Sequence, residues 1–170
     1  FGSVAVNQVT YQRVRSTTRQ FVGTFRKVRN DAILLNGIYR VAIDFDHNAW
    51  WVETQRKFEL LSTQEELEKQ QKKKEKDKKE EQVTNFVAAD KYSKTPKELP
   101  GDVVFEGLNK EKEGLLTQGV GYIHFFPNGF NEQAILYINK SETKQEGWSL
   151  LVRPTAGRIE IYDKHITTFD

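Results

Sequence analysis

The chain has 170 residues, of which 37% are hydrophobic and 29% are charged, and its formal net charge is +2. This composition fits a single domain with an embellishment and gives no reason to expect a polyanionic partner. The lack of cysteine excludes disulfides and thiolate chemistry, and no run of 18 apolar residues provides a transmembrane helix within this sequence. Because translation starts with methionine and the chain contains none, we expect a product processed or truncated at its N-terminus.

The first 35 residues carry the clearest pattern in the sequence. One seam of positions alternates between gaps of three and four residues: Val4, Asn7, Tyr11, Val14, Thr18, Phe21, Phe25, Val28, Ala32 and Leu35. This spacing predicts one continuous helix within residues 1–36, ended by Asn36-Gly37. At 1.5 Å per residue such a helix is roughly 48 Å long, which exceeds the width of a small domain. We therefore expect its C-terminal half to pack on the domain and its N-terminal half to protrude or contact another molecule.

The period changes from helix to strand after the helix. Residues 39–45 alternate apolar and polar side chains, the turn-forming Asp46-His47-Asn48 follows, and residues 49–53 return as a second strand. This pattern predicts a β-hairpin. Neighbouring positions on a strand face opposite sides of a sheet, so Trp50 or Trp51 is expected to be partly exposed.

The C-terminal third is rich in strand signals. Strands are predicted at residues 103–106, 120–126, 134–139, 148–153 and 158–162, with turns at Pro127-Asn128-Gly129 and at residues 154–157. We expect 120–126 to pair with 134–139 and 148–153 to pair with 158–162. The order of elements predicts an α+β fold, with the long N-terminal helix packed on the antiparallel sheet or sheets of a head formed by residues 37–170.

A charged segment interrupts the head. Residues 62–82 contain one apolar side chain, Leu67, together with seven lysines and seven acidic residues. Ser62 and Glu65 form a capping box, which predicts a solvated helix with no apolar face to bury. We interpret residues 62–100 as an exposed insertion, and because its charges cancel we expect no nucleic-acid contact there.

No pattern in the sequence predicts catalysis. The histidines, His47, His124 and His165, belong to no metal-binding spacing, no glycine-rich loop opens a helix, and no serine lies in a nucleophile elbow. We expect a protein that is not an enzyme and that holds no cofactor and no metal.

Several motifs nevertheless occur in an order that is typical of one protein family. Residues 18–34, ending in Arg29-Asn30-Asp31-Ala32-Ile33, run into residues 39–44 and then into Trp50-Trp51-Val52-Glu53. Residues 123–129 end in Pro127-Asn128-Gly129, where the family usually has Pro-Asp-Gly, and residues 154–158 form the last landmark. In this order the motifs resemble the GspH/FimT family, which includes minor pseudopilin H of the type II secretion system. The resemblance covers nearly the whole chain except the insertion.

The resemblance implies a pseudopilin or type IV pilin-like fold and a non-enzymatic structural role at or near the tip of a periplasmic pseudopilus. Such proteins carry a leader that is cleaved by a prepilin peptidase, are methylated, and have an apolar N-terminal segment that anchors them in the membrane. The chain would then be the periplasmic part of a single-pass protein of the bacterial inner membrane. Its implied partners are other pseudopilins in a helical filament, with the secretin and secreted cargo as further candidates.

The helix then divides into two parts near Val14. Val4, Val9 and Tyr11 are candidate subunit contacts, because nothing of the same chain is expected to cover them. The candidate helix-to-sheet core consists of Phe21, Phe25, Val28, Val41 and Ile43. A minor pilin of a type IV pilus, involved in pilus assembly or DNA uptake, is the alternative, although Glu160 and Asp163 interrupt the basic residues near the C-terminus.

Overall fold

A computed structural model describes residues 2–55, 86–141 and 147–170, and it describes side chains from residue 8 onward. Most of the predicted charged insertion, including its expected helix at 62–82, lies outside the described residues. The elements occur in the order α1 Gly2–Leu34, β1 Ile38–Asp44, β2 Ala49–Gln55, β3 Phe86–Ala88, β4 Lys97–Glu98, β5 Val103–Lys110, β6 Gly114–Leu116, β7 Val120–Phe125, β8 Ala134–Lys140, β9 Trp148–Val152 and β10 Ile159–Tyr162.

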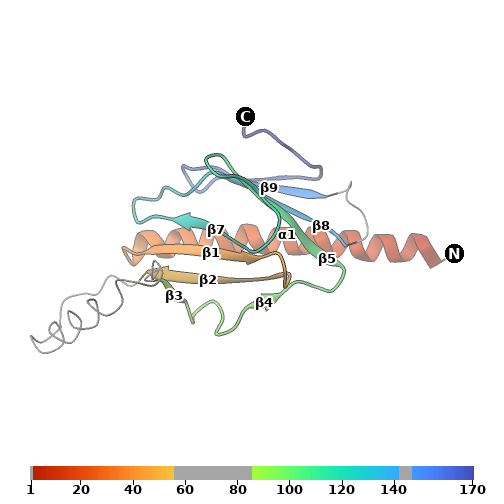
Figure 1. Cartoon of the computed structure of the whole chain (residues 1–170), viewed down its shortest axis with the longest axis horizontal. Coiled ribbons are helices and arrows are strands. Elements are labelled where there is room, and N and C mark those ends of the chain that lie inside the picture. The colour runs from red at the N-terminus through yellow and green to blue at the C-terminus, as the bar shows by residue number, and fades with distance from the viewer. Residues whose placement is uncertain (1, 56–85, 142–146) are drawn as a thin grey trace, which may run out of the picture.

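Helix α1 is continuous and runs along the whole length of the molecule, as predicted (Figure 1). It ends in a Schellman motif, in which Gly37 N–H donates to Ala32 O at 3.1 Å and Asn36 N–H donates to Ile33 O at 3.4 Å. Asn36 adopts a φ of 48°, a left-handed conformation that asparagine tolerates better than most residues. The Asn36-Gly37 signal therefore marks the true end of the helix.

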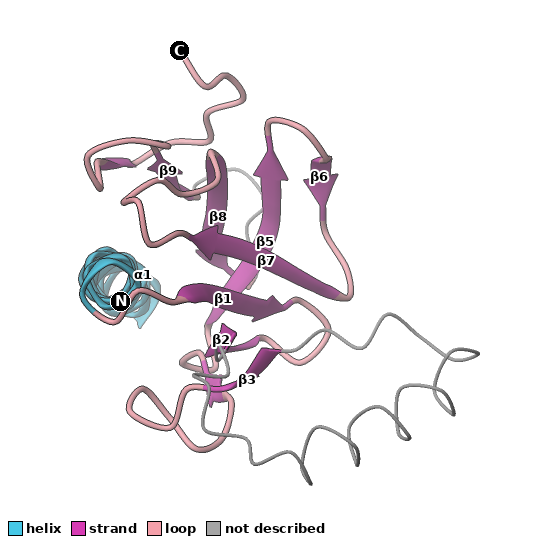
Figure 2. Cartoon of the chain, turned by 90° about the vertical axis from the view of Figure 1, so that its left-hand side faces the viewer, coloured by secondary structure: helices cyan, strands magenta, loops and turns pink. Residues whose placement is uncertain are grey.

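Two antiparallel sheets lie beside the helix (Figure 2). The first sheet has the order β3-β2-β1-β7, with β4 also paired to β2, and the second has the order β10-β9-β8-β5-β6. The predicted hairpins β1–β2 and β9–β10 are present with Val41 opposite Val52 and Ile159 opposite Val152. The fold is thus α+β, with one N-terminal helix packed on antiparallel sheets, as the sequence predicted.

One predicted strand pairing is wrong. Strand β7 pairs with β1 in the first sheet, whereas β8 lies between β5 and β9 in the second. Only an isolated bridge joins Phe125 to Asn131. The turn at Pro127-Asn128-Gly129 does reverse the chain, but eight residues separate the two strands, too many for a tight hairpin. The connection instead carries the chain from one sheet to the other.

The end of the expected insertion differs from the prediction as well. Residues 86–100 form β3 and β4, which both pair with β2. Ala89 and Leu99 are buried, and their amides donate to Val52 O at 2.8 Å and Asn48 O at 3.0 Å. This stretch is therefore part of the head. Its short strands cover the edge of β2 and pair with backbone groups that would otherwise be left unpaired there.

A single large core fills the space between α1 and the two sheets. The alternation along β2 puts Trp50 into this core, at 3% exposure, and turns Trp51 to the outer face of the first sheet, where its Nε1 donates to Glu53 at 2.8 Å. A second, small cluster lies on the other face of the second sheet, where Ile166 and Phe169 of the C-terminal tail cover Ile135 and Leu151.

Candidate functional site

The C-terminal half of α1 forms one wall of the core. Phe21, Phe25 and Val28 of α1 are fully buried, and so are Val41 and Ile43 of β1. The ring of Phe21 lies 4.9 Å from that of Trp50, and the ring of Phe25 lies 5.9 Å from that of Phe125. These five helix and strand residues, which the sequence pattern singled out, belong to one cluster.

The N-terminal end of α1 extends beyond the sheets (Figure 1). The side chain of Val4 lies outside the described residues, and Val9 is 51% exposed. Tyr11 is 49% exposed, but its ring packs against Trp148 of β9 with centroids 5.8 Å apart. The expectation that nothing of the same chain covers Tyr11 is therefore wrong, because β9 reaches further along the helix than the sequence could indicate.

Contact between the helix and the head begins about one turn before Val14. Thr10 is buried, and the Arg13 guanidinium pairs with Asp102 at 3.1 Å. Burial alone would raise the pKa of Asp102, but hydrogen bonds from Arg13 and Thr10 outweigh it and lower that pKa. The boundary between the packed and the protruding part of α1 therefore lies near Val9, and only residues before it extend beyond the head.

Arg29 of the helix contacts two turns that are distant in the sequence. Its Nε donates to Gly129 O at 3.0 Å, which ties the turn after β7 to the helix. A Cβ built on Gly157 would lie 2.8 Å from Arg29 Cδ, and one on Gly129 would lie 3.1 Å from an Arg29 terminal nitrogen. Both glycines have positive φ, 61° for Gly157 and 85° for Gly129. A side chain at position 157 would therefore collide with Arg29, whereas one at position 129 would meet only the movable end of the same arginine.

The outer face of the first sheet holds a charged pair that the sequence did not reveal. Arg40 of β1 is only 7% exposed, and its guanidinium lies 3.9 Å from the ring centroids of both Phe86 and Tyr122. Glu53 accepts from Arg40 Nε at 2.5 Å. Such stacking of a guanidinium between rings stabilises a buried cation. The alternation of β1 places Arg40 on the outer face, but finding its ring partners requires knowing that β3 and β7 flank the β1–β2 pair.

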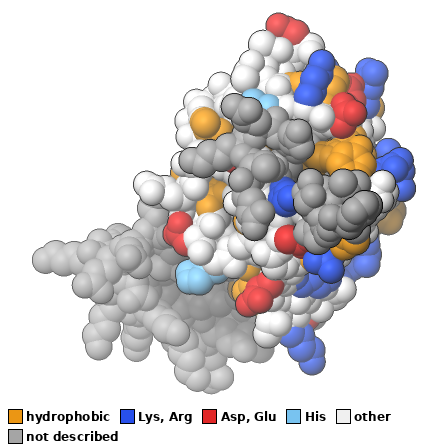
Figure 3. Space-filling model, turned by 90° about the vertical axis from the view of Figure 1, so that its right-hand side faces the viewer, with side chains coloured by type: hydrophobic (Ala, Val, Ile, Leu, Met, Phe, Trp, Pro, Cys, Tyr) orange, Lys and Arg blue, Asp and Glu red, His pale blue; other side chains and the backbone are white. Residues whose placement is uncertain are grey.

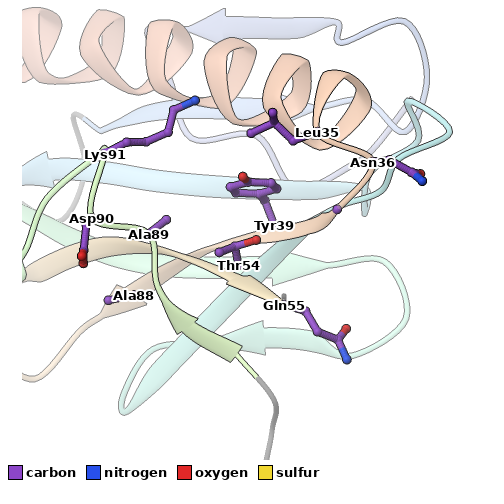
Figure 4. Close-up of a pocket in the computed structure, with 10 residues that line it drawn as sticks. Leu35, Asn36, Tyr39, Thr54, Gln55, Ala88, Ala89, Asp90 and Lys91 are labelled. Atoms are coloured by element: carbon purple, nitrogen blue, oxygen red, sulfur yellow. The ribbon is translucent and has the colours of Figure 1, made fainter. Parts of the chain in front are cut away.

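One hollow, of about 490 Å³, lies between the C-terminal end of α1 and the β2–β3 pair, and it is lined by Leu35, Tyr39, Thr54 and Lys91 among others (Figure 4). Asp31, nearby on α1, pairs with Lys91 at 2.7 Å and accepts from the Tyr92 hydroxyl. Burial would raise the pKa of Asp31, but these two partners lower it overall. The lining combines two amide and two hydroxyl side chains with Asp90, Lys91 and apolar residues.

A smaller hollow, of about 320 Å³, lies beside a series of ionic contacts that connects β5 to β7. Glu132 pairs with Lys110 of β5 at 3.0 Å and with His124 Nδ1 of β7 at 2.8 Å. Although burial opposes it, hydrogen bonds from His124 and Lys110 lower the pKa of Glu132 to about 2. Within residues 2–55, 86–141 and 147–170, no three histidine or acidic side chains converge in a way that could hold a metal ion.

The other histidines contribute to structure. His47 sits in the β1–β2 turn, where Asp44 accepts from its ring at 2.8 Å, and His165 stacks on Tyr137 with centroids 4.1 Å apart. No helix in the described part of the chain is both long and apolar enough to span a bilayer.

The described residues form one long helix packed on two antiparallel sheets. Solved structures with a similar fold include two of a minor pseudopilin. The crystal structure of the minor pseudopilin EpsH from the type II secretion system of Vibrio cholerae matches with a TM-score of 0.56 at 11% identity, over 92% of this chain and 98% of that chain. A second EpsH structure from the same system matches with a TM-score of 0.50 at 13% identity, over 89% and 97%.

The resemblance to minor pseudopilins read from the motifs is thus confirmed at the level of the fold. No protein-family model matches the chain, and no curated protein sequence is similar to it.

Proposed function

We propose that the chain is a minor pseudopilin, a non-enzymatic structural subunit at or near the tip of the periplasmic pseudopilus that drives type II secretion. The observation that carries this proposal is the likeness to EpsH over nearly the whole length of both chains, including the helix. The motifs that resemble the GspH/FimT family support it independently, because Arg29, Gly129 and Gly157 meet at one point of the structure.

The geometry of the helix suggests how such a subunit assembles. The packed half of α1 fixes the head, while residues before Val9 extend beyond it and are free to pack against other subunits. Subunits that meet head to tail build open helical filaments rather than closed rings. In this proposal Val4 and Val9 lie at contacts with neighbouring pseudopilins, Tyr11 lies at the rim of those contacts, and the secretin or secreted cargo meets the head.

An apolar segment preceding α1 would anchor the protein in the bacterial inner membrane, with this domain in the periplasm. The same helix would then serve first as an anchor and later as part of the filament axis. In this proposal the work on the cargo comes from a separate cytoplasmic ATPase.

The proposal is tested by deleting the gene in its host and measuring a type II cargo in the culture supernatant. We expect cargo to accumulate inside the cells and the full-length protein to restore its release. Copurification of the full-length protein with other pseudopilins is the second expected result. Normal secretion in the deletion strain, together with no pseudopilin in the copurified material, would exclude the proposal.

A minor pilin of a type IV pilus that acts in pilus assembly or DNA uptake is the second candidate, and one observation favours it. Arg19 and Arg26 are exposed on α1, and clustered cations are what a phosphate backbone requires. A shift assay with duplex DNA distinguishes the two. Binding that persists at about 0.15 M salt and weakens steeply as salt rises would favour the pilus role.

A further inference from the structure

The solvent-facing side of α1 contains a glycine that the head does not explain. Gly23 lies in the middle of the helix and is exposed, and beyond the backbone of its own helical turns no described atom lies within 4 Å of an added Cβ. Its φ is not positive, so no backbone strain requires glycine there. Glycine is the poorest helix former after proline, because it loses the most backbone entropy. Within the described structure, then, Gly23 weakens the helix and gains no contact.

Arginines flank this glycine on the same face. Arg15, Arg19, Gly23 and Arg26 are spaced by four, four and three residues, which places them in one row along the helix. Arg19 and Arg26 are exposed, and neither forms an ion pair with a residue that the structure describes. Figure 3 views the molecule from the N-terminal end of the helix and shows Lys and Arg side chains on the side where the helix lies.

The helix supplies no counter-charge to this row. Asp31 is the first acidic residue of the chain, and it is occupied by Lys91 and Tyr92. Arg13 and Arg29, by contrast, are engaged by Asp102 and by Gly129 O of the head. The helix therefore has two kinds of arginine, those that fasten it to its own head and those that point away from it.

We propose that the row Arg15, Arg19, Gly23 and Arg26 is a docking surface for an acidic segment of a neighbouring subunit, whose backbone approaches α1 closely at Gly23. The arginines of this row favour an acidic partner by charge complementarity. The missing side chain at Gly23 leaves room for the backbone of that partner between Arg19 and Arg26. This inference rests on the filament role proposed above, and it specifies that one contact between subunits pairs these arginines with acidic side chains. It lies on the packed half of α1, separate from the protruding residues before Val9.

Two variants test the two features separately. Gly23→Leu fills the notch, and Arg19→Glu with Arg26→Glu reverses the charge on both sides of it. Because these positions are exposed, we expect the 170-residue chain to keep its circular dichroism, and Gly23→Leu to raise its melting temperature, since leucine favours helix. In cells that produce the full-length protein, both variants should reduce cargo in the supernatant to the level of the deletion strain.

Each variant has a matched control. Gly23→Ala improves helix propensity but adds only one methyl group, so it should stabilise the chain and retain secretion. Lys112→Glu with Lys164→Glu changes the net charge by the same amount at exposed sites away from α1, and it should also retain secretion. Normal secretion by both Gly23→Leu and the Arg19/Arg26 variant, in a host where deletion blocks secretion, would overturn the docking surface and leave the proposed function standing.

Crosslinking identifies the segment that binds to this surface. A photoreactive residue in place of Ser16, exposed two turns before Gly23, should attach the full-length protein to a pseudopilin peptide that contains aspartate or glutamate. Crosslinks only to lipid, or none, would overturn the inference. So would binding of the chain to phosphatidylglycerol vesicles or to duplex DNA at about 0.15 M salt that the Arg19/Arg26 variant loses, since the row would then recognise phosphate.

Discussion

The packed and the protruding part of α1 share one seam but differ in what covers it. From Val14 to Ala32 the seam faces the two sheets, and Phe21, Phe25 and Val28 have no exposed surface. Before it, Val9 is half-exposed and the helix runs past the head. Polarity along the seam does not decide the boundary, because Thr18 is fully buried with its hydroxyl donating to Val14 O at 2.8 Å. The position at which α1 begins to pack on its own head is therefore set by how far the sheets extend along the helix, and not by the polarity of the seam residues.

The largest expected effect comes from removing a ring from the packed half. Phe25→Ala should cost about 3–5 kcal/mol of unfolding free energy, because it leaves a cavity between Phe21 and Phe125 that the two sheets cannot close. Urea unfolding followed by tryptophan fluorescence measures this loss. A change below about 1 kcal/mol would contradict a core built on this half of the helix.

Acid should weaken the head next most strongly. The pKa of Glu132 falls from 4.5 to about 2 on folding, so its stabilising contribution is complete at neutral pH and is lost as pH falls from 4.5 toward 2. Partial exposure limits the loss to about 3 kcal/mol at most. Unfolding free energies measured from pH 6 to pH 2.5 should show this slope in the wild type. The slope should be shallower in Glu132→Gln, and an identical slope in both proteins would argue against the assignment.

The Arg29 contact predicts an intermediate effect. Gly157→Ala should destabilise the head by about 1–3 kcal/mol, since alanine would be strained at φ 61° and its Cβ would meet Arg29. Gly114→Ala is the matched control, because Gly114 has a φ of 81° but no atom near an added Cβ. The Gly157 variant should be the more destabilised of the two in thermal unfolding. In Arg29→Ala the excess cost of Gly157→Ala should shrink, which a double-mutant cycle measures.

The smallest expected effect on stability lies at the protruding end. Val9→Ser should change the unfolding free energy of the 170-residue chain by less than about 0.5 kcal/mol, because the side chain is 51% exposed. In the full-length protein the same change should lower cargo secretion. Tyr11→Ser sharpens the boundary, since loss of the ring contact with Trp148 should cost roughly 0.5–1.5 kcal/mol. Equal losses for both variants would place the boundary before Val9.

Local signals in the sequence determined much of the fold. The alternating gaps of three and four residues fixed α1, Asn36-Gly37 fixed its end, and the period-two segments fixed the hairpins β1–β2 and β9–β10. The packed seam residues Phe21, Phe25 and Val28 followed from the same period. These features depend on residues a few positions apart, whose geometry the backbone itself imposes.

Only the tertiary structure decided what depends on distant residues. It paired β7 with β1 instead of β8, placed residues 86–100 against β2, and set Tyr11 on Trp148. It also buried Arg40 between two rings from strands that are far apart in the sequence. The physical reason is that strand order and cross-sheet contacts are selected by which arrangement buries the most apolar surface around α1. The alternation of side chains along a strand predicts which face is apolar, but it does not predict which other element packs against that face.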